Sequence, residues 1–489
     1  MIFSSDLFLF AFLPAALAGV VIARRLFGLH LYWIVAASLF FYGYWKPVYL
    51  PLIVTSIVLN FLLGRAIQRT RSTALMAFGV AANLLALGWF KYANFIEENV
   101  EWLSGADIGL PEIVLPLAIS FFTFQQISYL VDARNGRTHS HDFIQYAAFV
   151  SFFPQLIAGP ILQQKRTMQE FASPKAFRVT AEGLSWGLMI FIAGMAKKLL
   201  IADPMGTVAT PLFDQALTEP LAMAQAWTAA LAYSFQLYFD FSGYSDMAVG
   251  LGLMLGIRLP FNFNSPYRAV NIADFWRRWH ITLSSFLRDY LYIPLGGNRK
   301  GPSRTWVNLF IVMLLGGIWH GAGWTFVLWG ALHGAFLLIH RAWSGLARPA
   351  MPAAPALQPL GAAAGWALTM LSVAAAWVVF RADDMTAARN VWEGMAGLHG
   401  LDRPLEGADF LAGWRWTIFA ALGLMCLVLP NLPQVAGLTD PGGRWRQSVA
   451  ALYRPHLVGL VLAFAAFAAC FVMLRANSAV VPEFLYWDF

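Results

Sequence analysis

One histidine lies at a point in the sequence where packing alone does not explain it. An almost uninterrupted apolar run extends from Trp306 to His340, and His320 stands inside it directly before Gly321-Ala322-Gly323. As one helix the run would measure about 52 Å, too long for a single crossing of a hydrocarbon core about 30 Å thick and too short for two full crossings. Glycine tolerates backbone angles that end a helix, so the sequence predicts a break at these glycines.

His320 is the candidate general base. A histidine and a broken backbone are both costly at membrane depth unless they line a cavity inside the protein. Burial favours the neutral imidazole, which is the form that accepts a proton. The alternative is that His320 only satisfies backbone groups freed by the break. His333 and His340 lie further along the run, and for them we expect structural roles.

A second set of polar residues lies between residues 271 and 300. Asp274 is a candidate cap for an amphipathic helix with apolar positions at three-and-four spacing from Trp276 to Leu291. His280 falls within the apolar arc and is therefore expected to point into the core. The basic residues are expected to form a cytoplasmic mouth for an anionic cofactor phosphate: Arg277, Arg278, Arg299 and Lys300. The alternative is an interfacial helix with snorkelling arginines.

Two carboxylates, Asp240 and Asp246, interrupt the apolar run from Tyr233 to Gly250. A spacing of six places them on different faces of a helix, so we do not interpret them as an acid/base pair. Carboxylates at membrane depth usually have partners or water. Helix packing or capping beside Gly243 is the explanation that the residues alone favour.

The elements that position these residues are membrane helices. The chain of 489 residues is 59% hydrophobic and only 12% charged, with a mean hydropathy of +0.60, whereas soluble domains are about 25% charged. The net charge of +7 is assigned to cytoplasmic loops facing anionic lipid and not to nucleic acid. Cys426 and Cys470 lie in apolar runs, so neither a disulfide nor a metal site is expected.

The hydropathy pattern predicts a single all-α polytopic domain over residues 1–489, with about 11 to 13 transmembrane or re-entrant helices. The apolar segments fall near 7–23, 31–45, 48–64, 74–95, 113–131, 143–162, 184–202, 222–239, 244–257, 306–340, 361–380, 414–430 and 457–474. Pro154 and Gly159-Pro160 interrupt one of them, so residues 143–162 are expected to be re-entrant or broken. No internal repeat at a fixed period and no soluble domain is visible.

Loop charges predict the orientation in the membrane. Basic loops at Arg24-Arg25 and at residues 65–71 alternate with an acidic loop at residues 97–112. Cytoplasmic loops carry the excess of lysine and arginine, so the N-terminus is expected to be extracytoplasmic. Asp6 precedes the first apolar run, which favours a retained helix over a signal peptide.

Three stretches together resemble the membrane-bound O-acyltransferase family, in its bacterial alginate O-acetylation branch, close to the D-alanyl transfer protein of teichoic acids. They are RRWHITLSSFLRDYLYIPLGGNRKG, DFSGYSDMAVGLGLMLGI and IWHGAGWTFVLWGALHG, and the segments FFPQLIAGPI and EFLYWDF also fit. The resemblance implies a helical bundle around a central funnel or tunnel, with its catalytic core at residues 230–340. It also implies that His320 is the catalytic histidine and His280 the second polar position. With this function, we expect the tunnel or the path of the acyl donor to be lined by Trp319, Arg277, Arg278, Asp240 and Asp246.

In this branch the implied role is to move acetyl groups across the bacterial inner membrane to an exported polysaccharide such as alginate. The implied donor is acetyl-CoA, no bound cofactor is expected, and extracytoplasmic acetyltransferase proteins are the implied partners. No cysteine or Gly-x-Ser-x-Gly elbow is placed as a nucleophile, which favours direct transfer, although an acyl-histidine or acyl-serine stays open. Acetylation of peptidoglycan or cellulose is an alternative, and a secondary transporter is the alternative from another class.

Overall fold

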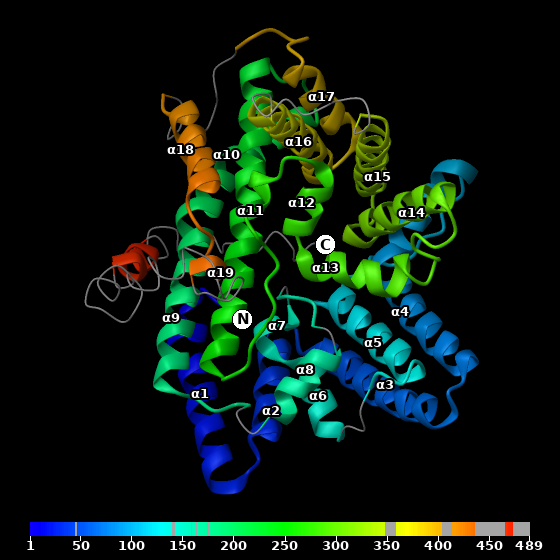
Figure 1. Ribbon diagram of the computed structural model, residues 1–489, viewed down its shortest axis with the longest axis vertical. Coiled ribbons are helices and arrows are strands. Elements are labelled where there is room, and N and C mark those ends of the chain that lie inside the picture. Colours follow the sequence, from blue (N-terminus) through cyan, green and yellow to red (C-terminus); the bar gives the residue numbers. More distant parts are fainter. Residues whose placement is uncertain are drawn as a thin grey trace.

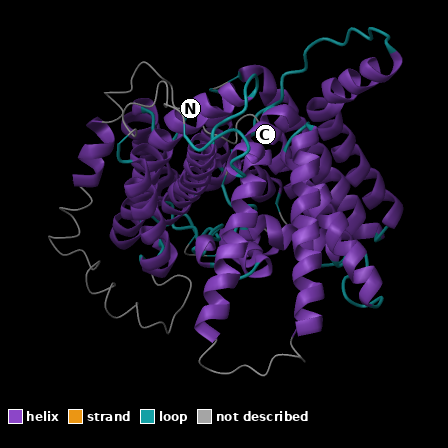
Figure 2. Ribbon diagram, turned by 90° about the horizontal axis from the view of Figure 1, so that it is seen from above, coloured by secondary structure: helices purple, strands orange, loops and turns teal. Residues whose placement is uncertain are grey.

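The computed structural model describes residues 1–44, 46–138, 142–157, 159–162, 164–173, 176–347, 358–402, 413–435 and 465–472. Within these ranges every regular element is a helix, as Figures 1 and 2 show. Six helical segments in the described part are long and apolar enough to cross a membrane: Phe8–Phe27, Pro47–Thr70, Thr73–Ser104, Ala181–Ala216, Trp324–Gly345 and Pro359–Arg381. The predicted all-helical membrane fold is confirmed, whereas the EFLYWDF segment lies outside the described residues.

The first third of the chain forms one group of packed helices. α1 (Leu13–Ile22) is extended by π-helical turns, η1 (Phe8–Phe12) and η2 (Ala23–Phe27). α2 (His30–Gly43) packs against α1, while α3 (Leu50–Thr70, preceded by the 3-10 turn η3, Pro47–Tyr49), α4 (Thr73–Ser104) and α5 (Ile119–Arg134) pack against one another. At one end of this group the Arg71 side chain donates a hydrogen bond to the backbone oxygen of Ala133. The basic ends of α3 and α5 therefore lie on one side, as the loop charges require.

The segment expected to be broken is broken. α6 (Phe143–Ser151) ends before Phe152, α7 (Phe153–Leu156) adds a single turn, and α8 (Gln164–Ala172) follows after an irregular stretch. Pro154 lies in the first turn of α7, where its missing N–H does no harm because N–H groups of the first turn have no acceptor within the helix. The structure therefore confirms the break in residues 143–162.

The longest central helix is α11 (Met223–Met254), which the sequence had divided into segments at 222–239 and 244–257. That division is wrong, because Gly243 serves helix packing and does not end the helix. A Cβ built on Gly243 would lie 2.6 Å from the backbone oxygen of Gly194 in α9 (Ala181–Ala196). α9 continues through the π-helical η4 (Lys197–Ala202) into α10 (Asp203–Ala216), and all three pack on α11 (Figure 1).

The remaining helices follow α11 along the chain, and those from α12 to α16 contain or contact the histidines. The chain passes the 3-10 turn η5 (Pro266–Arg268), then α12 (Ile272–Arg278), α13 (Ile281–Leu287) and the π-helical η6 (Arg288–Tyr292). α14 (Pro302–His320) and α15 (Trp324–Ala347) form an antiparallel pair, and α16 (Gln358–Arg381) packs against α15 and α11. α17 (Met385–Met395) packs against α10, α11 and α16, α18 (Arg415–Val428) contacts α11, and the short α19 (Leu432–Val435) follows.

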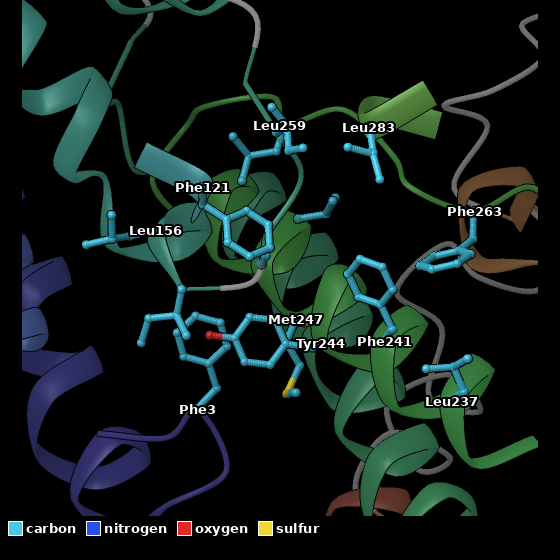
Figure 3. Close-up of a cluster of buried hydrophobic side chains, with 14 of the residues drawn as sticks. Phe3, Phe121, Leu156, Leu237, Phe241, Tyr244, Met247, Leu259, Phe263 and Leu283 are labelled. Carbon is cyan, nitrogen blue, oxygen red and sulfur yellow. The ribbon is translucent and has the colours of Figure 1, made fainter. Parts of the chain in front are cut away.

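The N-terminal residues are part of the core. Phe3 is fully buried and stacks on Tyr244 of α11 with ring centroids 4.7 Å apart. Figure 3 shows these two rings near Phe121 of α5 and Leu156 of α7, with Leu283 of α13 in the same cluster. Side chains from widely separated parts of the sequence thus form the apolar interior on which α5, α11 and α13 rest.

Candidate active site

His320 lies at the predicted break. α14 ends at His320 and α15 begins at Trp324, so the long apolar run forms two helices and not one. A Cβ built on Gly321 would lie 2.1 Å from the ring of Phe326, which explains why the tight connection requires glycine there. The connection returns the chain alongside α14 and leaves the His320 side chain buried, with only 4% of its surface exposed.

Aromatic rings enclose the His320 imidazole. Its centroid lies 4.9 Å from that of Trp319, 5.0 Å from that of Trp329 and 5.2 Å from that of Phe380. All three contacts are edge-to-face, an arrangement that aromatic rings favour. Trp319 is itself stacked on Phe124 of α5 at 4.9 Å, and its predicted place in the lining of the donor path stays a prediction. A site of this kind excludes water and strengthens electrostatic interactions within it.

The end of α14 is held by two neighbouring side chains of α4. Lys91 Nζ donates to the backbone oxygens of Trp319 at 2.5 Å and of His320 at 3.0 Å. The Tyr92 hydroxyl donates to the backbone oxygen of Ile318 at 2.7 Å. The last carbonyls of a helix have no N–H donors within the helix, so side chains of α4 supply donors in place of those that the glycine break removes.

His280 occupies a second break, which the sequence did not predict. The expected helix from Asp274 through Leu291 is wrong, because α12 ends at Arg278 and α13 begins at Ile281. Backbone hydrogen bonds to the irregular segment at residues 262–264 replace the helical ones: Asn264 N–H donates to the Arg278 oxygen, and Ile281 N–H donates to the Asn262 oxygen. Asn271, and not Asp274, caps α12 by accepting from the Asp274 N–H at 2.8 Å.

The break gives His280 an unusual conformation. Its φ of 42° lies in the left-handed region, which is uncommon for residues other than glycine, although asparagine, aspartate and histidine adopt it more often than the rest. The side chain is completely buried and lies edge-on to Phe241 of α11 at 4.8 Å. Neither ring nitrogen has a hydrogen-bond partner among the described residues. A buried polar group without a partner costs free energy, so packing alone does not account for a histidine at this position.

The structure brings three histidines into one region. A charge on His280, Lys91 or His333 acts electrostatically on His320. His333 also contacts Trp329, with its centroid 4.8 Å from that ring, and its Nδ1 accepts a hydrogen bond from Trp276 Nε1 at 3.3 Å. Linear spacing along one helix had placed His333 far from His320, and the α14–α15 turn removes that separation. The Trp276 contact agrees with a structural role for His333.

The two aspartates of α11 have lysine partners. Asp246 accepts from Lys197 at 2.5 Å, and Lys198 lies 2.8 Å from Asp240 and 2.7 Å from Asp203. Both lysines belong to η4, so these ion pairs join the α9–α10 segment to α11. Helix pairing is therefore sufficient to explain the burial of Asp240 and Asp246, and their predicted place on the donor path stays a prediction.

Arg277 and Arg278 differ in their availability. Both pair with Asp274, Arg278 at 2.9 Å and Arg277 at 3.4 Å. Arg278 also donates to the backbone oxygen of Asn264 at 3.2 Å, and its side chain is 30% exposed, against 72% for Arg277. Of the two, Arg277 is the better placed to bind an anionic group from outside.

Sequence reasoning missed two features of the site. A lysine inside the apolar segment at 74–95 is unusual, so Lys91 and the adjacent Tyr92 could have been suspected of a role from the sequence. The residues that they bind on α14 are more than two hundred positions away in the chain, so their partners could not have been predicted. Trp329, which contacts both His320 and His333, resembles any other aromatic residue of an apolar helix. Neither position can be assigned without knowing how α4, α14 and α15 pack.

The sequence is similar to a family of membrane enzymes and to several named proteins. Residues 67–372 match the family described as MBOAT, membrane-bound O-acyltransferase. The chain is 44% identical over 447 residues to the peptidoglycan O-acetyltransferase of Helicobacter pylori, covering 84% of this chain and 83% of that protein. It is 44% identical over 405 residues to the probable alginate O-acetylase AlgI of Pseudomonas aeruginosa, covering 81% of this chain and 75% of that protein. The teichoic acid D-alanyltransferase of Streptococcus thermophilus is 30% identical over 246 residues, covering 48% and 59%.

Proposed function

Because the chain belongs to the membrane-bound O-acyltransferase family, we propose that it transfers acetyl groups from a cytoplasmic thioester donor to an exported polysaccharide. The observation that carries the proposal is the pair of buried histidines, each placed at a helix break. His320 is enclosed by aromatic rings, and His280 has two ring nitrogens without a partner among the described residues. A base and a second polar group in a site closed to water are what acyl transfer between oxygen and sulfur requires.

In the proposed reaction, His320 removes the proton of an acceptor hydroxyl as its oxygen attacks the thioester carbonyl carbon. The tetrahedral intermediate carries negative charge on the former carbonyl oxygen, and a protonated His280 nitrogen can donate a hydrogen bond to it. When the intermediate collapses, the carbon–sulfur bond breaks and the thiolate takes the proton from His320. The products are an acetyl ester and a free thiol, and His320 returns to its neutral form.

The proposed donor is acetyl-CoA, which reaches the site from the cytoplasmic side. Arg277 supports this part of the proposal, since its largely exposed guanidinium is held only loosely by Asp274 at 3.4 Å. Guanidinium groups bind phosphate through paired hydrogen bonds, and the donor carries phosphates far from its thioester. We place the chain in the bacterial inner membrane, with the N-terminus outside and extracytoplasmic acetyltransferase proteins as partners.

Two acceptors have specific support. Alginate is the first, because the AlgI relative from Pseudomonas aeruginosa is named for alginate and reaches 44% identity. Peptidoglycan is the second, since the Helicobacter pylori relative named for peptidoglycan reaches the same identity over a larger share of this chain. A secondary transporter, the alternative from another class, has no support from these relatives.

A direct test uses the purified protein in nanodiscs with acetyl-labelled acetyl-CoA. We expect the label to leave CoA only when an acceptor hydroxyl or the partner proteins are supplied. Parallel expression in cells making alginate and in cells modifying peptidoglycan, followed by measurement of ester-linked acetate in each polymer, separates the two acceptors. Failure of the purified protein to consume acetyl-CoA under any of these conditions would contradict the proposed donor.

A further inference from the structure

Lys91 binds the backbone next to the proposed base, but the proposed reaction gives it no role. It lies in the middle of α4, half-buried, and its ammonium caps two consecutive carbonyls at the end of α14. The next residue, Tyr92, caps the carbonyl before them. Three successive carbonyls, ending with that of His320, are thus bonded from one turn of another helix.

The partners of Lys91 are unusual for a lysine at membrane depth. Among the described residues no carboxylate lies within ion-pair distance of it, although Lys197 and Lys198 of η4 both have aspartate partners. Its ammonium instead contacts the carbonyls of α14 and lies 5.9 Å from the centroid of the Trp319 ring. The C-terminal end of a helix carries a partial negative charge, which is the natural partner for a cation that lacks a carboxylate.

That partial charge matters for the reaction. His320 is the last residue of α14, so the negative end of this helix lies at the proposed base and would oppose the negative charge that develops on the acyl oxygen during transfer. A positive group on the last two carbonyls cancels this effect. The same contacts fix the backbone of His320, and with it the direction of its ring.

We propose that Lys91 is a positioning residue for acyl transfer, which holds the last turn of α14 and neutralises its negative end beside the reacting atoms. This inference rests on the proposed function of His320. It assigns Lys91 no contact with the substrate, so its removal should slow the chemical step and leave donor binding nearly intact.

The test compares Lys91→Met and Lys91→Arg with Tyr92→Phe, which removes a neutral cap one carbonyl earlier. A charge-assisted hydrogen bond contributes about twice as much as a neutral one, so we expect Lys91→Met to lower kcat about tenfold to a hundredfold and Tyr92→Phe about threefold or less. The KM for acetyl-CoA should stay within about twofold in all variants. Lys91→Arg keeps the charge and should recover a substantial part of kcat. All rates are expressed per folded molecule, as measured by size-exclusion chromatography.

Hydrogen–deuterium exchange gives a readout that does not depend on activity. Lys91→Met should speed amide exchange in the last turn of α14 relative to the wild-type protein. A Lys91→Met protein with wild-type kcat, or equal losses in Lys91→Met and Tyr92→Phe with no recovery in Lys91→Arg, would overturn the inference. If the wild-type protein transferred no acetyl group, the proposed function would fail, and the exchange measurement would still decide whether Lys91 holds α14.

Discussion

His280 offers a test in which stability and activity are expected to change in different directions. The side chain is completely buried, and both ring nitrogens lack partners among the described residues. An unpartnered buried polar atom costs about 1 to 3 kcal/mol, whereas a hydrophobic replacement of similar volume usually costs less than about 1.5 kcal/mol. We therefore expect His280→Leu to be as stable as the wild-type protein or more stable.

The same substitution should abolish most of the activity. If His280 stabilises the developing oxyanion, its loss should reduce kcat about a hundredfold to a thousandfold, as for the removal of a single oxyanion donor. His280→Asn retains an N–H donor and tolerates the left-handed φ of 42°, so it should keep part of the activity.

The assay measures the apparent Tm in detergent and the acetyl-transfer rate in nanodiscs for the same preparations. A lower Tm in His280→Leu, with activity lost only in proportion to the unfolded fraction, would indicate that His280 is a packing residue. Such a result would refute the assignment of its free nitrogens to the substrate.

The remaining predictions concern the donor, the helix pairing and the topology. Arg277→Gln should raise the KM for acetyl-CoA about tenfold, since a charge-assisted contact contributes about 1.5 to 3 kcal/mol, while Arg278→Gln should mainly lower Tm; equal effects on KM would contradict this division. Lys198→Met leaves a buried carboxylate without its cation, so it should reduce membrane abundance strongly, and adding Asp240→Asn should restore part of it in quantitative blots. A reporter that is active only in the cytoplasm should be active when fused after Arg71, and activity of a reporter that works only outside the membrane would reverse the predicted orientation.

The sequence predicted the parts of the fold that depend on local rules. The break after His320 follows from the length of the apolar run and from Gly321, and the break in residues 143–162 follows from Pro154 and Gly159-Pro160. Both predictions used only the spacing of glycine, proline and apolar residues, which act within a few residues along the chain.

The predictions that failed depended on contacts between distant segments. α11 runs on through Gly243 because this glycine allows close packing against Gly194 of α9. His280 lies outside any helix because residues 262–264 form hydrogen bonds with the backbone on either side of it. His333 approaches His320 only after α15 folds back on α14. Such contacts have no local signature, so sequence reasoning finds the histidines but not how they are held.

The central claim is that His320 is the general base for acetyl transfer. The most direct measurement is the transfer rate of His320→Gln in nanodiscs, with His340→Gln on α15 as the matched histidine control and membrane abundance measured for both. We predict normal abundance for both variants, near wild-type transfer by His340→Gln, and a loss of about a hundredfold to ten-thousandfold for His320→Gln. Near wild-type transfer by well-folded His320→Gln protein would contradict the claim.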